Sequence, residues 1–303
     1  MWSRLKTELR DAFELVLFPG LAAFLPWSWC FAVFKRLARM RWLYAQQVEG
    51  ALSQARRYGW AGENESHWLW TRRLVTLVDH ADYYLVLTRG DAWFRRHFTV
   101  QGAWYPSGQA SLLLTFHWGA GMWSLHHAAA AGLKVHSMVA ALDGKHFAGR
   151  WILRRYAVAR TAIMSRISGP ATLDVSNSLR PVLKALKAQE QVFAVVDVPA
   201  DQVSASQSIE LLGLQARVPR ALFRVAVDQK VPVSVYLVGL NPEDGQRFLR
   251  IHQFGVYQDV DTLIKDVFLV LEQAIRETPA AWHFWGEAER FFGPASGSDS
   301  QAR

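Results

Sequence analysis

Short apolar segments alternate with helical stretches along most of the chain, and this alternation constrains the fold more than any other feature. Segments typical of strands occupy positions 111–116, 135–140, 191–196, 208–212, 231–238 and 248–252. Stretches with helical spacing occupy 45–58, 66–90, 121–131, 145–159, 177–189, 219–229 and 260–277. Apolar strands that alternate with helices are typical of a parallel sheet covered on both faces. We therefore expect an α/β fold with a mixed, mostly parallel sheet flanked by helices.

The N-terminal region departs from this pattern. The 20 residues between Glu14 and Lys35 carry no charge, although Pro19 and Pro26 interrupt them. A stretch of that length is about what a helix needs to cross a bilayer. Four basic residues follow within seven positions, and basic and aromatic residues beside an apolar stretch suit an interface with anionic lipid. We expect residues 1–44 to associate with a membrane, either spanning it or lying on it. The alternative is a buried apolar helical hairpin.

Charge and composition narrow the choice of partner. The chain has 34 Lys and Arg against 26 Asp and Glu, and its net charge of +8 favours an anionic partner. The basic residues are spread along the chain without zinc-finger spacing or an RNA-binding signature, which argues against nucleic acid and for membrane lipid. The single cysteine, Cys30, excludes an internal disulfide and a multi-cysteine metal site. We accordingly expect no metal. No P-loop, GxGxxG after a strand or GxSxG occurs, so we expect no nucleotide cofactor and no serine nucleophile.

Positions 115–123, with the sequence TFHWGAGMW, form the strongest candidate for chemistry. A strand ends there, His117 follows, and Gly119 and Gly121 precede a helix. Ligands of parallel sheets bind beyond the carboxyl ends of the strands, where a histidine is suited to act as a general base. The glycines let a substrate approach the backbone, and the helix N-terminus favours a phosphate or an oxyanion. Taken alone, His117 fits equally well as a histidine that satisfies buried backbone groups.

These residues resemble the first sequence block of the lysophospholipid acyltransferase superfamily, in particular the bacterial lipid A biosynthesis (lauroyl/myristoyl) acyltransferases. In that family the histidine is followed five positions later by Glu or Asp. Similar blocks follow in the family's order: Ala141-Leu142-Asp143 with 150–156, 183–190 with Val195-Val196-Asp197, 212–217, and Trp282-His283-Phe284-Trp285-Gly286 with Arg290-Phe291-Phe292. The resemblance covers most of residues 10–292, and the N-terminal apolar segment matches the family's membrane anchor.

The resemblance implies transfer of a fatty acyl group from an acyl thioester to a hydroxyl or amine of a lipid or glycolipid acceptor, with His117 as general base. The donor would be acyl carrier protein or coenzyme A, and the net charge of +8 would favour encounter with an acidic carrier protein. Residues 45–293 would form an acyltransferase-like domain on the cytoplasmic face of the bacterial inner membrane, because the heavier basic flank follows the anchor. Residues 294–303 are expected to be a flexible tail.

The sequence departs from the family motif at the decisive position. Met122 stands five positions after His117, and a methionine cannot orient an imidazole or compensate its charge. Three explanations remain open. Asp197, at the end of another strand, orients His117; a backbone carbonyl orients it; or catalysis is lost. In the third case the chain is a non-catalytic protein that binds lipid or a partner on a degenerate acyltransferase scaffold.

Other basic residues are candidates for substrate binding. Arg150 and Arg154 belong to a basic cluster that suits a phosphate or a carrier-protein surface, and a solvated helix face is the alternative. Arg217 lies beside a glycine turn, and its planar guanidinium suits a phosphate or a carboxylate. The expected substrate-binding residues are therefore Gly119, Gly121, Arg150, Arg154 and Arg217.

Overall fold

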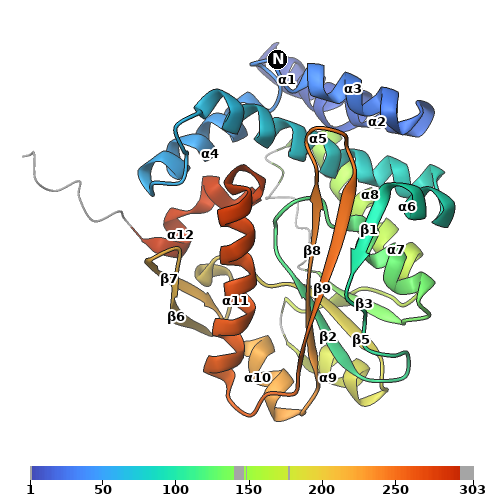
Figure 1. Ribbon diagram of the computed structural model, residues 1–303, viewed down its shortest axis with the longest axis vertical. Helices are drawn as coiled ribbons and strands as arrows, with labels where there is room; N and C mark the ends of the chain where they lie inside the picture. The colour runs from blue at the N-terminus through green and yellow to red at the C-terminus, as the bar shows by residue number, and fades with distance from the viewer. Residues whose placement is uncertain (1, 140–146, 148, 177, 294–303) are drawn as a thin grey trace, which may run out of the picture.

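The computed structural model, which describes residues 2–139, 147, 149–176 and 178–293, has an α/β fold (Figure 1). Among these residues, seven strands form one sheet in the order β1-β9-β8-β2-β5-β3-β4, and β6 and β7 form a separate antiparallel pair. Within the larger sheet only the β8–β9 pair is antiparallel. The expected α/β fold with a mixed, mostly parallel sheet flanked by helices is confirmed.

The strands are β1 (Phe98–Gln101), β2 (Ser111–Thr115), β3 (Val135–Val139), β4 (Leu173–Asp174), β5 (Gln191–Val195), β6 (Ser206–Leu211), β7 (Leu214–Pro219), β8 (Val233–Leu240) and β9 (Arg247–Gly255). The α-helices are α1 (Trp2–Asp11), α2 (Phe18–Phe24), α3 (Trp27–Leu37), α4 (Ala45–Arg57), α5 (Glu65–Thr88), α6 (Asp91–His97), α7 (Met122–Ala130), α8 (Trp151–Ser168), α9 (Arg180–Lys187), α10 (Ala221–Asp228), α11 (Val260–Glu277) and α12 (Glu289–Phe292). A π-helical turn, η1 (Ala12–Leu17), and the 3-10 turns η3 (Ala200–Gln202), η4 (Pro279–Ala281) and η5 (His283–Glu287) complete the elements described here.

All six predicted strands are present, and the helix predicted over 260–277 has those bounds. The sequence patterns missed β1, β4 and β7. β1 and β4 are short strands at the two edges of the sheet, where little apolar sequence is needed. The expected strand position 140, the Ala141-Leu142-Asp143 block, the start of the helix predicted from 145, position 177 and the tail 294–303 lie outside the described residues.

The sheet is covered on both faces, which explains its apolar strands. Every residue of β2 is buried. Leu112 and Leu114 belong to the core beneath α9, α10 and α11, whereas Leu113 packs into a second core with residues of α6 and α7. Because side chains alternate along a strand, a central strand between two helical layers must be apolar at consecutive positions.

The uncharged N-terminal stretch is divided among η1, α2 and α3 rather than forming one continuous helix. Pro26 caps α3, and the chain is extended at Leu25 just before it, which separates α3 from α2. One side of these helices is buried, including Ala22, Cys30 and Phe34, while Phe24 is 85% and Trp29 is 70% exposed. No helix in the described part of the chain is both long and apolar enough to cross a membrane.

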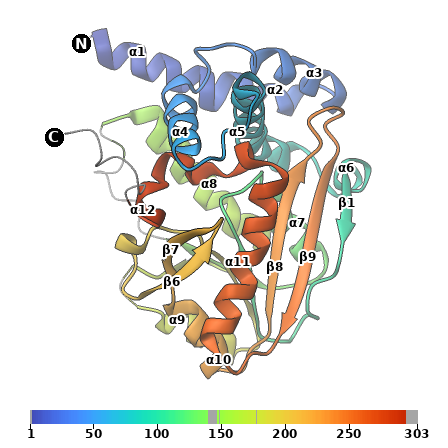
Figure 2. The same ribbon diagram turned by 60° about the vertical axis from the view of Figure 1, so that its left-hand side comes forward.

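Helix α5 lies between the N-terminal helices and the sheet, as Figures 1 and 2 show. The α1–α3 layer sits at the end of the sheet where β8 turns into β9. Trp27 of α3 donates a hydrogen bond from Nε1 to the carbonyl of Gly245 in that turn, at 3.0 Å. Because β2 and β5 run parallel to β8, their carboxyl ends also lie at this end of the sheet.

Candidate active site

His117 and Asp197 meet where β2 and β5 end. The two strands are parallel neighbours in register, Thr115 beside Val195, so the residues that follow them emerge side by side. Nδ1 of His117 lies 2.9 Å from Oδ1 of Asp197. The backbone amide of His117 also donates to both carboxylate oxygens, at 2.9 and 3.0 Å. Of the three explanations for Met122, this geometry favours the one in which Asp197 orients the imidazole.

The pair has the asymmetry that a general base requires. Asp197 is fully buried, whereas the side chain of His117 is 37% exposed. With Nδ1 donating to the carboxylate, Nε2 of the neutral ring is left unprotonated and able to accept a proton from a substrate. The ring of Phe284 packs against the imidazole, with 4.2 Å between the ring centroids. Met122 is buried at the first position of α7.

The segment around Trp282 forms the other side of the site. Nε1 of Trp282 donates to Oδ2 of Asp197 at 2.9 Å, so both carboxylate oxygens are engaged. The amide of His283 donates to the carbonyl of His117 at 2.6 Å. Its ring Nε2 lies 2.7 Å from the carbonyl of Gly119. Burial lowers the pKa of His283 to about 3, with a smaller contribution from Arg72, so this histidine is neutral and donates to that carbonyl.

Two buried arginines fix this arrangement. Arg72 of α5 donates to the carbonyls of Trp282 and His283, each at 2.9 Å, and burial lowers its pKa to about 10. Arg247 of β9 forms a fully buried bidentate ion pair with Asp82 of α5 and donates to the carbonyl of Ala120 at 3.1 Å. Helix α5 therefore contributes to the support of both the His117 loop and the segment that follows α11.

The two glycines of the loop, Gly119 and Gly121, differ in backbone conformation and in the space available for a side chain. Gly119 has φ +73°, and a Cβ atom there would lie 2.0 Å from the carbonyl oxygen of Val238. The backbone of the loop thus runs against β8, and the amide of Ala120 donates to that same carbonyl at 3.1 Å. Gly121 has φ −86°, and a Cβ there would meet nothing within 4 Å. Only Gly119 is required by the fold of the loop, and Gly121 leaves open space at the start of α7.

The predicted arginines lie apart from this pair. Arg150 forms a bidentate ion pair with buried Asp11 of α1, at 2.8 and 2.5 Å. Arg154 is exposed on α8, and Arg217 is exposed on β7, where it donates to the hydroxyl of Ser206 at 2.9 Å. Within the described residues, none of the three is hydrogen-bonded to His117 or Asp197. Their proposed contacts with substrate stay predictions.

Sequence reasoning did not include the supporting residues in the site. Trp282 and His283 entered that reasoning only as part of the 282–286 block, and Arg72 was given no role in the site. One available signal was the placement of Arg72 and Arg73 among apolar positions of a long helix, because a buried arginine needs several acceptors. In the part of the chain that the structure covers, no group of three or more His, Cys, Asp or Glu is arranged to hold a metal ion.

The fold and the site define an α/β protein with a histidine–aspartate pair at the carboxyl ends of two parallel strands. No family model matches the sequence. A search of the curated proteins finds no match either.

Proposed function

We propose that this protein is an acyltransferase of the kind that the sequence resemblance indicates, moving a fatty acyl group from an acyl thioester to a hydroxyl or amine of a lipid or glycolipid acceptor. The observation that carries the proposal is the 2.9 Å contact between His117 Nδ1 and Asp197 Oδ1. It supplies the orienting carboxylate that Met122 removes from the family motif, and it favours the enzyme over the non-catalytic alternative.

The chemistry follows from the free ring nitrogen. Nε2 of His117 takes the proton from the acceptor hydroxyl or amine as that atom attacks the thioester carbonyl. The carbon–sulfur bond then breaks, and the proton passes from His117 to the departing sulfur. Asp197 stabilises the imidazolium between the two steps, as the acid of a serine-protease triad does. The amides of Met122 and Trp123, in the first turn of α7, precede the first backbone hydrogen bond of the helix and would stabilise the oxyanion, with Gly121 leaving room for it.

Surface composition supports a membrane-bound acceptor. Fourteen large apolar side chains are exposed among the described residues, and nine of them lie within residues 1–44: Trp2, Leu5, Leu9, Val16, Leu17, Phe24, Trp29, Met40 and Trp42. The same segment carries more basic than acidic residues. Exposed aromatic and basic residues together suit the surface of an anionic bilayer. We place the protein on the cytoplasmic face of the bacterial inner membrane, lying on the bilayer, with acyl carrier protein as the preferred donor.

The test is acyl transfer in vitro. Purified full-length protein is incubated with radiolabelled acyl carrier protein thioesters and vesicles made from the source bacterium's total lipid. His117→Ala should lower the rate by about 10²–10⁴-fold, the usual contribution of a general base. His252→Ala, which removes an exposed histidine of β9, should leave it unchanged.

The same assay can also overturn the proposal. Background signal from folded wild-type protein, across several chain lengths and with coenzyme A thioesters as well, would overturn the acyltransferase and favour the lipid- or partner-binding alternative. A labelled product would in addition identify the acceptor.

A further inference from the structure

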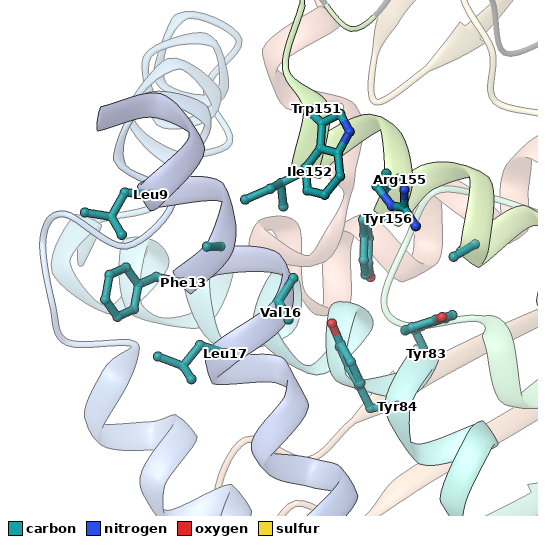
Figure 3. Close-up of a pocket in the computed structure, with 12 residues that line it drawn as sticks. Leu9, Phe13, Val16, Leu17, Tyr83, Tyr84, Trp151, Ile152, Arg155 and Tyr156 are labelled. Carbon is teal, nitrogen blue, oxygen red and sulfur yellow. The ribbon is translucent and has the colours of Figure 1, made fainter. Parts of the chain in front are cut away.

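An open apolar groove of about 620 Å³ lies on the N-terminal side of α8, and its lining does not include His117, Asp197 or Trp282. Figure 3 shows the groove between α1 and η1 on one side and α8 and α5 on the other. Its volume falls in the range of about 300–1,000 Å³ that is common for ligand pockets. Its walls consist of apolar and aromatic side chains, and Arg155 is the one charged residue among the described residues that line it.

Two of the three tyrosines that line the groove, Tyr84 and Tyr156, present their rings while their hydroxyls are hydrogen-bonded within the protein. The hydroxyl of Tyr84 donates to the carbonyl of Leu15 at 2.7 Å. That of Tyr156 lies 3.0 Å from Nδ1 of His80, and Arg160 donates to it. Along these two side chains a polar ligand would lose its hydration and gain no partner, whereas a hydrocarbon chain would be buried at no such cost.

The acidic residues of α1 and η1, beside the groove, make contacts within the protein. The carboxylate of Glu8 accepts hydrogen bonds from the amides of Trp151 and Ile152 at 2.7 and 3.0 Å, which caps α8. Asp11 is buried against Arg150, and Glu14 accepts from the amide of Tyr44. These contacts hold the three carboxylates in hydrogen bonds within the protein, and that of Asp11 also in an ion pair.

The rim of the groove is apolar and cationic. Leu9, Val16, Leu17 and Trp151 line the groove and are all among the exposed large apolar side chains. The guanidinium of Arg155 lies over the Trp151 ring, 4.9 Å from its centroid, and makes no ion pair with an acidic residue among those described. An unpaired guanidinium beside an apolar opening matches a molecule with a hydrocarbon chain and an anionic head.

We propose that this groove binds one acyl chain of an anionic phospholipid that remains in the bilayer, with Arg155 beside the headgroup phosphate. The inference rests on the membrane contact of the proposed function and is independent of acyl transfer at His117. A chain drawn into the groove would hold the protein on the bilayer surface without any helix that crosses it.

The experiment uses full-length protein and vesicles of phosphatidylcholine with about one third phosphatidylglycerol, the latter carrying a photoreactive diazirine on one acyl chain. After illumination, cross-linked peptides are identified by mass spectrometry. We expect cross-links to concentrate on η1, the start of α8 and the Tyr83–Tyr84 turn of α5. Ala159→Trp and Ala12→Trp, which fill the groove from opposite walls, should each reduce them at least 10-fold.

Controls separate this proposal from the enzymatic one. Leu269→Trp, an exposed position on α11, should leave the cross-links unchanged, and so should His117→Ala. Arg155→Gln should reduce the preference for phosphatidylglycerol over phosphatidylcholine several-fold. Circular dichroism establishes that each variant is folded.

Three results would overturn the inference. The first is cross-links spread evenly over the exposed apolar residues and insensitive to both Trp variants. The second is labelling that a free fatty acid in solution abolishes at equimolar concentration, which would make the occupant a free acid. The third is the absence of cross-links from vesicles that the protein binds.

Discussion

Oδ1 of Asp197 lies 2.9 Å from Nδ1 of His117, although 80 positions of sequence separate the two residues. The same carboxylate accepts hydrogen bonds from the backbone amide of His117 and from the indole of Trp282. One buried acid thus fixes the ring of the histidine, the end of β2 and the segment after α11.

Asp197→Asn should lower kcat for acyl transfer by about 10⁴-fold while leaving the fold intact. The amide oxygen of the new side chain still accepts from Trp282 and the backbone, but the charge that stabilises the imidazolium is gone. Asp201→Asn, which changes an exposed aspartate paired with Arg290, should leave kcat within about two-fold, since a surface ion pair contributes little. Single-turnover rates measure both. An Asp197→Asn variant whose rate stays within a few-fold of wild type would show that His117 is oriented by another group.

The loop glycines should respond differently to the same added methyl group. Gly119→Ala forces a Cβ against the carbonyl of Val238 in a left-handed conformation and should lower the free energy of unfolding by about 2–4 kcal/mol. Gly121→Ala meets open space at φ −86° and should cost no more than about 1 kcal/mol. Urea unfolding gives both values. Equal costs would mean that the loop does not run against β8.

Removing one partner of the buried Asp82–Arg247 pair should strongly lower the free energy of unfolding. Arg247→Met leaves the Asp82 carboxylate without its counter-charge in the core and should destabilise the protein by about 3–5 kcal/mol. Adding Asp82→Asn to that variant should restore part of the loss. Arg250→Met, three positions further along β9 and next to a half-exposed Glu277, should change stability by less than about 1 kcal/mol. Thermal unfolding of the four proteins completes the comparison.

Stability should fall with acid because His283 is held neutral. In the unfolded chain its imidazole titrates near pH 6.5, whereas burial lowers its folded-state pKa to about 3. Between those values the unfolded state binds a proton that the folded state does not, so this residue reduces stability as the pH falls from about 6.5 toward 3, by at most about 1.4 kcal/mol per pH unit. His283→Gln, whose amide can still donate to Gly119, should show a shallower slope in urea titrations at pH 4 to 7. An unchanged slope would contradict a His283 that is held neutral in the folded protein.

Encounter with an acidic carrier protein should depend on salt. Raising NaCl from about 50 to about 500 mM should lower kcat/KM for acyl carrier protein thioesters several-fold, because screening weakens the attraction to a protein of net charge +8. The rate with an uncharged acyl-pantetheine should stay nearly constant and serves as the control. A salt-independent rate with the carrier protein would argue against electrostatic docking of the donor.

For the N-terminal segment, the local sequence pattern did not decide which side chains are buried. Its apolar composition and its prolines were evident in the sequence, but either a membrane segment or a buried hairpin fitted them. The folded chain places Cys30 and Phe34 in the core and leaves Phe24 and Trp29 exposed. Which side of a helix is covered depends on the partners that pack against it, here α5 and the turn between β8 and β9, and those partners are distant in sequence.

The sequence by itself determined the α/β fold, the six strands it predicted and the position of His117 at a strand end, because these depend on local periodicity of apolar residues. It also named Asp197 as a candidate partner, since both residues follow predicted strands. Only the tertiary structure decided that β2 and β5 are neighbours in register, that Trp282 and Arg72 support the pair, and that Arg150 is bound to Asp11. Those relationships depend on strand order and on contacts between distant segments, which no local pattern encodes.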